Sequence, residues 1–274
     1  MKYADLHLHT VFSDGTYTPE QLIAQSCKAK LSAIAVVDHD TIEGIQPVKK
    51  IAVAHNIEVL AGIELSAEYD GIEIHILGYL IDFKNELLAK RLRDLKANRI
   101  ERIFRIVEKL KDAGVSLSPD SVFTIAQQGT VGRLHVARAM VKEGKVGSIT
   151  EAFQRYIGDK SCAYVLGFKL SPQEAIQLIK DAAGIPVLAH PYSINNDDLI
   201  LEFIDMGIMG LEAYYPEHSQ SMINFYLALA REHNLLVTGG SDCHGNAKPE
   251  VKIGSLKVSY ELVEKLKEAQ AGMR

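Results

Sequence analysis

Residues 33–41 read Ala-Ile-Ala-Val-Val-Asp-His-Asp-Thr, an apolar stretch that ends directly in charged and polar side chains. A short run rich in Val and Ile is typical of a strand buried in a parallel sheet. Polar groups at the end of a buried strand are costly unless they are paired or bind a metal. The stretch therefore predicts both a core strand and one edge of a polar site.

Similar apolar runs recur along the chain, with amphipathic segments between several of them. They are Tyr3–His9, Ala33–Asp38, Ile57–Glu64, Ile72–Leu80, Ile185–His190, Ile208–Tyr214 and Leu235–Gly239. Two of the amphipathic segments begin with a helix-capping residue followed by proline, at Thr18-Pro19 and Ser171-Pro172. Strands that alternate with helices predict an α/β fold, either a βα barrel or an open sheet.

The alternation stops between residues 84 and 160, where helical patterns follow one another and the longest covers Glu86–Ala113. We therefore expect a barrel formed by residues 1–83 and 161–274, with residues 84–160 as a helical insertion. This segment holds 16 Lys and Arg against 9 Asp and Glu, a net charge of +7, and the rest of the chain carries −12. The positive excess suits an anionic substrate, and a solvated helical surface would explain it equally well.

Composition points to a globular protein rather than a membrane or secreted one. Hydrophobic residues make up 47% of the 274 residues and charged residues 24%. No apolar run approaches the roughly 20 residues that a membrane span needs, and the N-terminus has no apolar signal-peptide core. The three cysteines are widely spaced and form no disulfide framework. We expect a cytoplasmic protein without a membrane contact or an obligatory protein partner.

Histidines gather at the ends of the predicted strands. Six of the ten histidines lie there: His7, His9, His39, His75, His190 and His244. In barrel folds, catalytic groups collect at one end of the strands. His7 and His9 are two residues apart on a strand, so both imidazoles point to the same face and can reach one metal ion.

Three carboxylates accompany these histidines. Asp14 lies in a Ser-Asp-Gly turn, Glu64 ends an apolar strand, and Asp242 belongs to the segment Ser-Asp-Cys-His-Gly. Each has an ordinary structural explanation by itself, but their convergence with six histidines at strand ends is hard to attribute to chance. Imidazole and carboxylate ligands suit zinc, manganese or iron, and a shared carboxylate favours several ions close together.

The motifs D-L-H-x-H-T-x-x-S-D-G, D-H-D-T, G-x-E, H-x-L-G, A-H-P and S-D-x-H-G resemble those of the PHP (polymerase and histidinol phosphatase) superfamily. The resemblance covers the barrel portion in the right order. It is closer to the TrpH/RNase AM-like branch, which includes 3′,5′-nucleoside bisphosphate phosphatases. Residues 132–138 resemble its G-R-P-H-x-A-R segment and residues 211–219 its E-x-Y-H-P-E-H-S segment. Leu134 replaces a proline and Tyr215 a histidine; we expect neither to touch a metal ligand, but both to alter substrate contacts.

The resemblance implies a distorted (βα)7 barrel with two or three divalent ions of manganese, zinc or iron. One ion would be held by His7, His9, Glu64 and Asp242. A second would be held by Glu64, His75 and His190, with Glu64 bridging, and a third by Asp14, His39 and His244. Glu64, Asp242 and His190 are the residues to which it assigns catalysis.

The implied activity is hydrolysis of phosphate esters of nucleotides, namely 3′,5′-nucleoside bisphosphates or the 5′ ends of short RNA. Candidate substrate contacts are Arg133 and His135 in the basic insertion, Arg99 one helical turn from Arg102, and His218. An arginine can grip a phosphate with two parallel hydrogen bonds. Two alternatives remain open at this stage: a phosphatase for another small metabolite such as histidinol phosphate, and a metal-binding module without catalysis.

Overall fold

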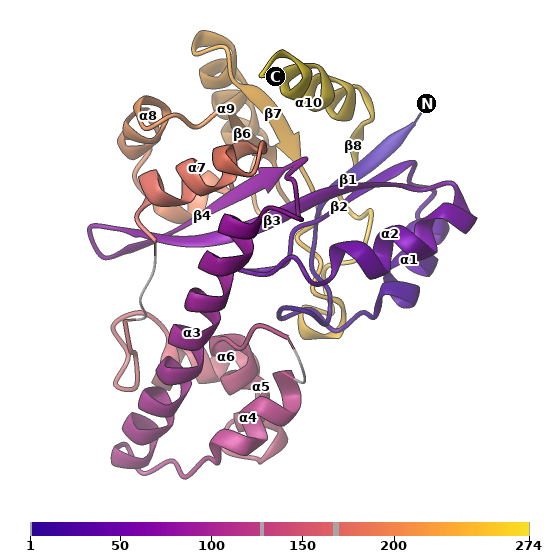
Figure 1. Cartoon of the computed structure of the whole chain (residues 1–274). Coiled ribbons are helices and arrows are strands. Elements are labelled where there is room, and N and C mark those ends of the chain that lie inside the picture. Colours follow the sequence, from indigo (N-terminus) through magenta and orange to yellow (C-terminus); the bar gives the residue numbers. More distant parts are fainter. Residues whose placement is uncertain (1, 127–128, 167–169, 274) are drawn as a thin grey trace.

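The computed structural model describes residues 2–126, 129–166 and 170–273. Its strands form one eight-stranded sheet in the order β7-β6-β5-β4-β3-β2-β1-β8 (Figure 1). Their bounds are β1 (Tyr3–Leu8), β2 (Ala33–Val36), β3 (Glu58–Tyr69), β4 (Ile72–Tyr79), β5 (Ile185–Leu188), β6 (Gly210–Tyr214), β7 (Leu236–Gly239) and β8 (Val258–Ser259). The short strand β8 pairs antiparallel with β1 and adds to the seven strands that the sequence predicts.

The sheet curls into a nearly closed barrel because the segment after β7 returns to β1. The backbone N–H of His9 donates to the carbonyl of Cys243 at 3.2 Å. Buried Asp5 accepts hydrogen bonds from the backbone N–H and the hydroxyl of Ser241 at 2.8 and 2.7 Å. A Cβ atom at Gly240 would lie 2.3 Å from the backbone nitrogen of His7, so this close approach requires glycine.

Strand β4 runs in the direction opposite to the one that its sequence predicts. The apolar run Ile72–Leu80 predicts a parallel strand, but β4 pairs antiparallel with both β3 and β5. Asp70 and Gly71 form a two-residue turn with φ angles of 50° and 79°, whereas a parallel connection needs a crossover of about a dozen residues or more. The antiparallel direction brings the first half of β4 beside the second half of β3.

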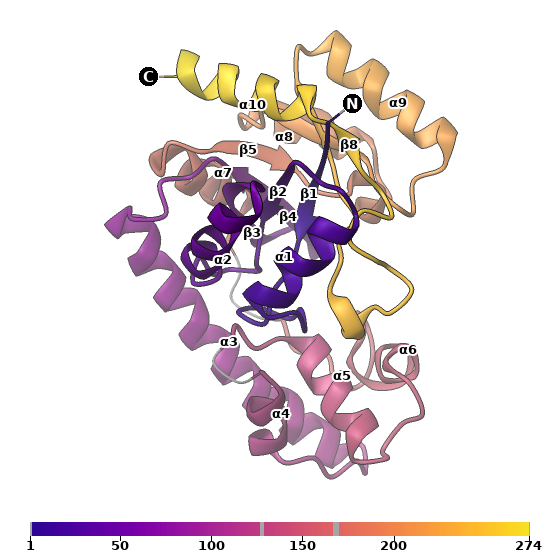
Figure 2. The same cartoon turned by 90° about the vertical axis from the view of Figure 1, so that its right-hand side faces the viewer.

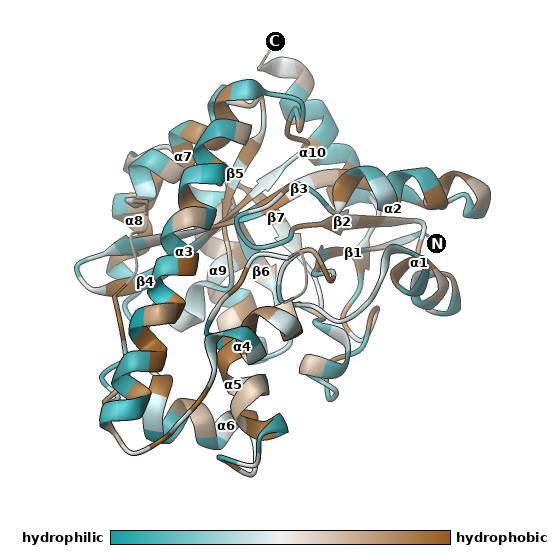
Figure 3. Ribbon diagram, turned by 60° about the horizontal axis from the view of Figure 1, so that its bottom comes forward, coloured by the Kyte–Doolittle hydropathy of each residue, from teal (hydrophilic) through white to brown (hydrophobic). Residues whose placement is uncertain are grey.

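One group of α-helices packs around the sheet (Figures 1 and 2). They are α1 (Pro19–Lys28), α2 (Ile45–Ala52), α7 (Pro172–Asp181), α8 (Asp198–Asp205), α9 (Gln220–Glu232) and α10 (Glu261–Gly272). The predicted helix starts at Thr18 and Ser171 are confirmed, since each side chain accepts from the third helical N–H and forms a capping box. Helix and strand faces that meet in the interior are hydrophobic, while outer faces are hydrophilic (Figure 3).

A second group of helices lies to one side of the barrel and has a hydrophobic core of its own. They are α3 (Glu86–Asp112), α4 (Pro119–Ala126), α5 (Arg133–Lys142), α6 (Ile149–Ala152) and the π-helical turn η2 (Phe153–Ile157). Helix α3 joins both parts, because Leu88 and Leu92 pack in the barrel core and Ile103 and Ile106 in the second core. None of the helices in the described ranges is both long and apolar enough to cross a membrane.

Candidate metal centre

Nine histidine and carboxylate side chains converge at one end of the barrel, and we call them the histidine cluster. Its members are His7, His9, Asp14, His39, Glu64, His75, His190, Asp242 and His244. They come from the ends of parallel strands, from the loops that follow, and from the hairpin of β3 and β4. The antiparallel hairpin matters here, because it brings His75 near the start of β4 to the same edge as Glu64 in β3.

Glu64 lies at the centre of the histidine cluster with both carboxylate oxygens engaged. Its Oε2 lies 3.1 Å from Nε2 of His7 and 3.2 Å from Nε2 of His9. Its Oε1 lies 2.9 Å from Nδ1 of His75 and 3.1 Å from Nε2 of His190. A carboxylate that faces two separate groups of imidazoles has the geometry of a bridging ligand.

Two further carboxylates flank Glu64. Asp242 Oδ1 lies 3.4 Å from Nε2 of His7 and 3.1 Å from Nε2 of His9. On the other side, Asp14 Oδ1 lies 3.3 Å from Nε2 of His244, and Asp14 Oδ2 lies 3.8 Å from Nε2 of His39. The three groups that the resemblance implies are therefore also groups in space.

The donor atoms suit divalent ions in number, type and spacing. Three sets have ligand atoms within 4.8 Å of one another: His9 with Asp14, His39 and His244; His7 with His9 and Asp242; and His39 with Glu64 and His75. The Nδ1 atoms of His9 and His39 are buried without a hydrogen-bond partner among the described residues. Buried polar atoms normally have partners, and an ion would supply them here.

Burial and mutual charge set the protonation of the histidine cluster. Burial alone would raise the pKa of Glu64, yet His39, His7 and His75 hold that pKa well below its ordinary value. Burial lowers the pKa of His39 to about 3, although Glu64 and Asp14 oppose the shift. Although burial opposes the shift, neighbouring carboxylates, Glu64 among them, raise the pKa of His9 to about 9 and that of His75 to about 10. Ionised Glu64 and neutral His39 are in the form that binds metal ions, whereas His9 and His75 must lose a proton to do so.

Two members of the histidine cluster have positive φ angles, a backbone conformation that residues other than glycine rarely adopt. His190 has a φ of 27° and Asp242 a φ of 55°. Such conformations cost free energy and persist where the surrounding structure enforces them, commonly at functional sites. Here the His190 N–H donates to Glu212 at 2.9 Å, and Asp242 lies in the segment that closes the barrel.

A second layer of side chains orients the histidine cluster, and most of its members were not predicted from the sequence. Buried Glu212 in β6 lies 2.8 Å from Nδ1 of His7 and fixes the orientation of that ring. Asp242 Oδ2 accepts hydrogen bonds from the Tyr215 hydroxyl at 2.8 Å and from Lys248 Nζ at 2.9 Å. A carboxylate inside the apolar run Ile208–Tyr214 was the signal that could have identified Glu212.

The position of Tyr215 corrects one expectation from the sequence. Tyr215 was expected not to touch a presumed metal ligand, but its hydroxyl donates directly to Asp242. The side chain is buried because its ring packs between His190 and His218, with ring centroids 5.3 and 5.4 Å apart. The other departure, Leu134, lies on the wall of the cavity described next, where it can contact substrate.

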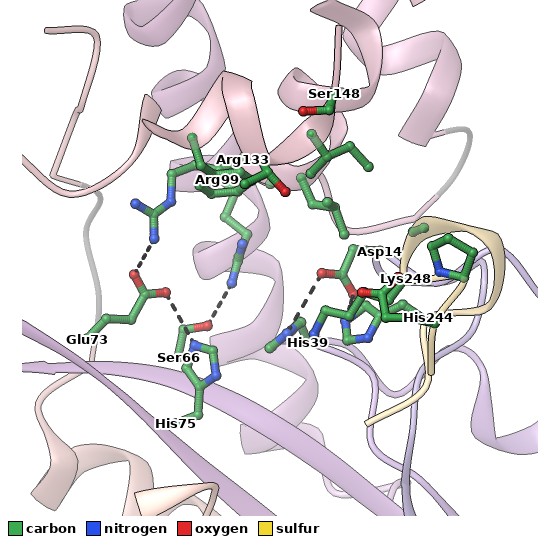
Figure 4. Close-up of a pocket in the computed structure, with 18 of the residues that line it drawn as sticks. Asp14, His39, Ser66, Glu73, His75, Arg99, Arg133, Ser148, His244 and Lys248 are labelled. Atoms are coloured by element: carbon green, nitrogen blue, oxygen red, sulfur yellow. Dashed lines mark hydrogen bonds and ion pairs between the residues drawn. The ribbon is translucent and has the colours of Figure 1, made fainter. Parts of the chain in front are cut away.

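The histidine cluster opens into a cavity of about 540 Å³ between the barrel and the helices α3 and α5 (Figure 4). Asp14, His39, His75 and His244 line it on the barrel side. The opposing side chains include three arginines, which we call the arginine wall: Arg99 and Arg102 from α3, and Arg133 from α5. A cavity of this size matches small-molecule sites and exceeds a single phosphate group.

Two arginines of this wall are tied to carboxylates. Arg99 binds Asp40 through Nε at 2.7 Å and donates from Nη2 to the Ser66 hydroxyl at 2.8 Å. Arg133 binds Glu73 at 2.8 Å and Asp159 at 2.6 Å. Glu73 in turn lies 3.2 Å from Nε2 of His75, so Arg133 is connected to the histidine cluster.

The other two predicted substrate contacts do not line the cavity. His135 is buried, and its Nδ1 accepts from the backbone N–H of Gly132 at 3.1 Å, which caps the start of α5. His218 Nδ1 donates to the carbonyl of Ala213 at 2.9 Å, and its ring packs against Tyr192 and Tyr226. Burial lowers the pKa of both imidazoles, that of His135 to about 4.

A barrel whose strand ends bring histidines and carboxylates together beside a cavity of small-molecule size defines a class of metal-dependent hydrolases. Comparison with known proteins then gives the family. The PHP domain matches residues 5–109. A 5′-3′ exoribonuclease of Haemophilus influenzae is 33% identical over 248 residues, which cover 89% of this chain and 90% of that protein. The chain belongs to the PHP family of metal-dependent phosphoesterases.

Two further comparisons agree with this assignment. The 3′,5′-nucleoside bisphosphate phosphatase of Chromobacterium violaceum is 30% identical over 250 residues, covering 89% of this chain and 88% of that protein. A crystal structure from Bifidobacterium adolescentis, described as that of a metal-dependent phosphoesterase, superposes with a TM-score of 0.89 at 31% identity. The superposed region covers 96% of this chain and 94% of the Bifidobacterium adolescentis chain. The protein is therefore a phosphoric ester hydrolase, and a metal-binding module without catalysis is set aside.

Proposed function

We propose that this phosphoesterase hydrolyses phosphate esters of nucleotides, either 3′,5′-nucleoside bisphosphates or the 5′ ends of short RNA. The observation that carries the proposal is the shared cavity, in which the histidine cluster and the arginine wall face the same volume. A phosphate monoester needs a site for the phosphate that reacts, and a nucleotide substrate brings further negative charge. The names of the relatives from Haemophilus influenzae and Chromobacterium violaceum support the same substrate class.

We propose the following metal ligands, as two or three sets, the first two of which share Glu64. The sets are His7, His9, Glu64 and Asp242; Glu64, His75 and His190; and Asp14, His39 and His244. When bound, manganese, zinc or iron supplies activated water for attack on phosphorus and neutralises charge on the phosphoryl oxygens. Glu64, Asp242 and His190 would be the catalytic side chains.

The chain's own groups would assist in three ways. Tyr215 and Lys248 hold one oxygen of Asp242, which leaves the other oxygen directed at the imidazoles. Arg133 fixes Glu73 beside His75, and Arg99 fixes Asp40 next to His39. Arg99 and Arg133 would also present positive charge to a bound phosphate, whereas we propose only supporting roles for His135 and His218, which do not line the cavity.

The experiment that tests the function pairs metal analysis with a substrate panel. Protein purified without chelator is expected to contain two or three transition-metal ions per chain by elemental analysis. Turnover should be faster on adenosine 3′,5′-bisphosphate or a short 5′-phosphorylated RNA than on histidinol phosphate. Less than one ion per chain after reconstitution with manganese would contradict the shared-ligand sites, and a preference for histidinol phosphate would contradict the nucleotide assignment.

We also propose that the protein works in the cytoplasm as a single enzyme. All three cysteines are unpaired, and two of them, Cys27 and Cys162, are exposed, which suits a reducing compartment. The small substrates proposed above require no second protein to complete the site. Gel filtration, with catalytic activity assayed across the eluted peak, would test whether the chain acts without a partner.

A further inference from the structure

Arg102 differs from the other arginines that face the cavity. Its side chain lies on the inward face of α3 and is only 8% exposed, yet it contributes to the cavity lining. Nε donates to the carbonyl of Val165 at 2.8 Å, and the guanidinium lies over the ring of Tyr164. Nη2 is buried with no hydrogen-bond partner among the described residues.

No carboxylate of the described residues forms an ion pair with Arg102, whereas Arg99 and Arg133 both have carboxylate partners. Burial and the neighbouring charge of Arg133 lower the pKa of Arg102 to about 10, although the carboxylate of Glu73, which is too far for an ion pair, opposes the shift. The side chain is therefore still a cation at neutral pH. A buried cation without a counter-charge is unfavourable, and proteins usually pair such groups.

We propose that Arg102 binds a second anionic group of the substrate, a phosphate that is not hydrolysed, on the wall formed by α3 and α5. This inference rests on the proposed function, since it assumes that the histidine cluster takes the phosphate that reacts. The anion would supply the direct ion-pair partner that Arg102 lacks among the described residues, and a guanidinium offers phosphate a planar pair of donors. Arg99 and Arg133 are less available for this task because their carboxylate partners already occupy them.

The cavity has room for both anions. Its volume of about 540 Å³ reaches from His39 and His75 to Arg102 without interruption. A ligand with two phosphates joined by a sugar is of the size that such cavities hold. Arg102 would thus select substrates with a second phosphate over those with one.

The test compares ligands with one and two phosphates in two variants of α3. Arg102→Met removes the cation and keeps the length of the side chain. The matched control is Arg105→Met, one turn further along, where the side chain is 60% exposed and pairs with Glu101. Each metal-loaded protein is assayed for hydrolysis of p-nitrophenyl phosphate in the presence of adenosine 3′,5′-bisphosphate, adenosine 3′-monophosphate or adenosine 5′-monophosphate, which gives three inhibition constants.

We expect the wild-type protein and Arg105→Met to bind the bisphosphate about tenfold or more tightly than either monophosphate. A charged hydrogen bond from Arg102 to the second phosphate would account for a difference in affinity of this size. In Arg102→Met this preference should disappear, because binding of the bisphosphate weakens while binding of the two monophosphates changes little. Because an uncompensated buried cation is removed, the ligand-free variant should melt at the same temperature or higher. If it does not fold, Arg102→Gln, which keeps a donor for the Val165 carbonyl, is tested with the same expectations.

Two results would overturn the proposal: no preference for the bisphosphate in the wild-type protein, or equal weakening of all three ligands in Arg102→Met. The second result would mean that Arg102 supports the fold or contacts the reacting phosphate. Failure of the proposed function is a separate outcome, in which the bisphosphate competes tightly and depends on Arg102 but is not itself hydrolysed.

Discussion

The histidine cluster and the arginine wall face the same cavity but balance their charges in different ways. In the cluster, each of the three carboxylates lies within 3.5 Å of at least one imidazole, and Glu64 contacts imidazoles through both oxygens. In the wall, Arg99 and Arg133 have carboxylate partners, while Arg102 has none among the described residues. The histidine cluster has side chains suited to binding metal cations. In the arginine wall, we propose that the cation Arg102 binds an anionic group of the substrate.

This difference separates residues that build the site from those that select its substrate. Removing a shared carboxylate should affect every substrate, because the ions themselves depend on it. Removing an arginine paired with a carboxylate should also affect every substrate, through the partner that it positions. Removing the unpaired arginine should affect only substrates with a second anion.

The largest effect is expected for Glu64→Gln. Glutamine preserves the shape of the side chain but loses the charge that would hold two cations together, so turnover should fall by about a thousandfold or more. Metal content should fall as well, while circular dichroism should show an unchanged fold. The matched control is Glu68→Gln on the same strand, which is expected to keep activity. Activity near that of the wild-type protein in Glu64→Gln would remove this residue from the mechanism.

An intermediate effect is expected for Arg133→Met. The change removes the ion pair between Arg133 and Glu73, which lies beside His75. We expect kcat/KM to fall by an amount equivalent to about 2–4 kcal/mol, as when one partner of a partly buried charge pair is lost. The loss should be equal on nucleotides and on p-nitrophenyl phosphate, with unchanged metal content by elemental analysis. Arg155→Met, at an exposed ion pair, provides the control. A loss confined to the bisphosphate would instead assign Arg133 the role that we give to Arg102.

The smallest effect is expected for Tyr215→Phe, which removes one hydrogen bond to Asp242 and keeps the packing of the ring. The remaining donor, Lys248, still holds the same oxygen. We expect kcat/KM to fall by about 1.5 kcal/mol, or roughly tenfold, on all substrates alike, measured by steady-state kinetics. Unchanged kinetics would show that Lys248 alone orients the carboxylate of Asp242.

The sequence by itself determined the strand ends and the side chains at them. Strand periodicity and the polar residues closing apolar runs are local properties, so His7, His9, Glu64 and Asp242 could be found without coordinates. The direction of β4 was missed, although Asp70-Gly71 was a readable turn signal, because a short apolar run looks the same in parallel and antiparallel strands.

Only the tertiary structure decided which charges meet. Arg99, Arg102 and Arg133 look alike in the sequence, and their different roles follow from partners far along the chain: Asp40, Val165 and Glu73. The same is true of Glu212 with His7 and of Tyr215 with Asp242. Local patterns specify which residue types a segment presents, but electrostatic pairing depends on distances between segments, and the closure of the barrel and the packing of α3 set those distances.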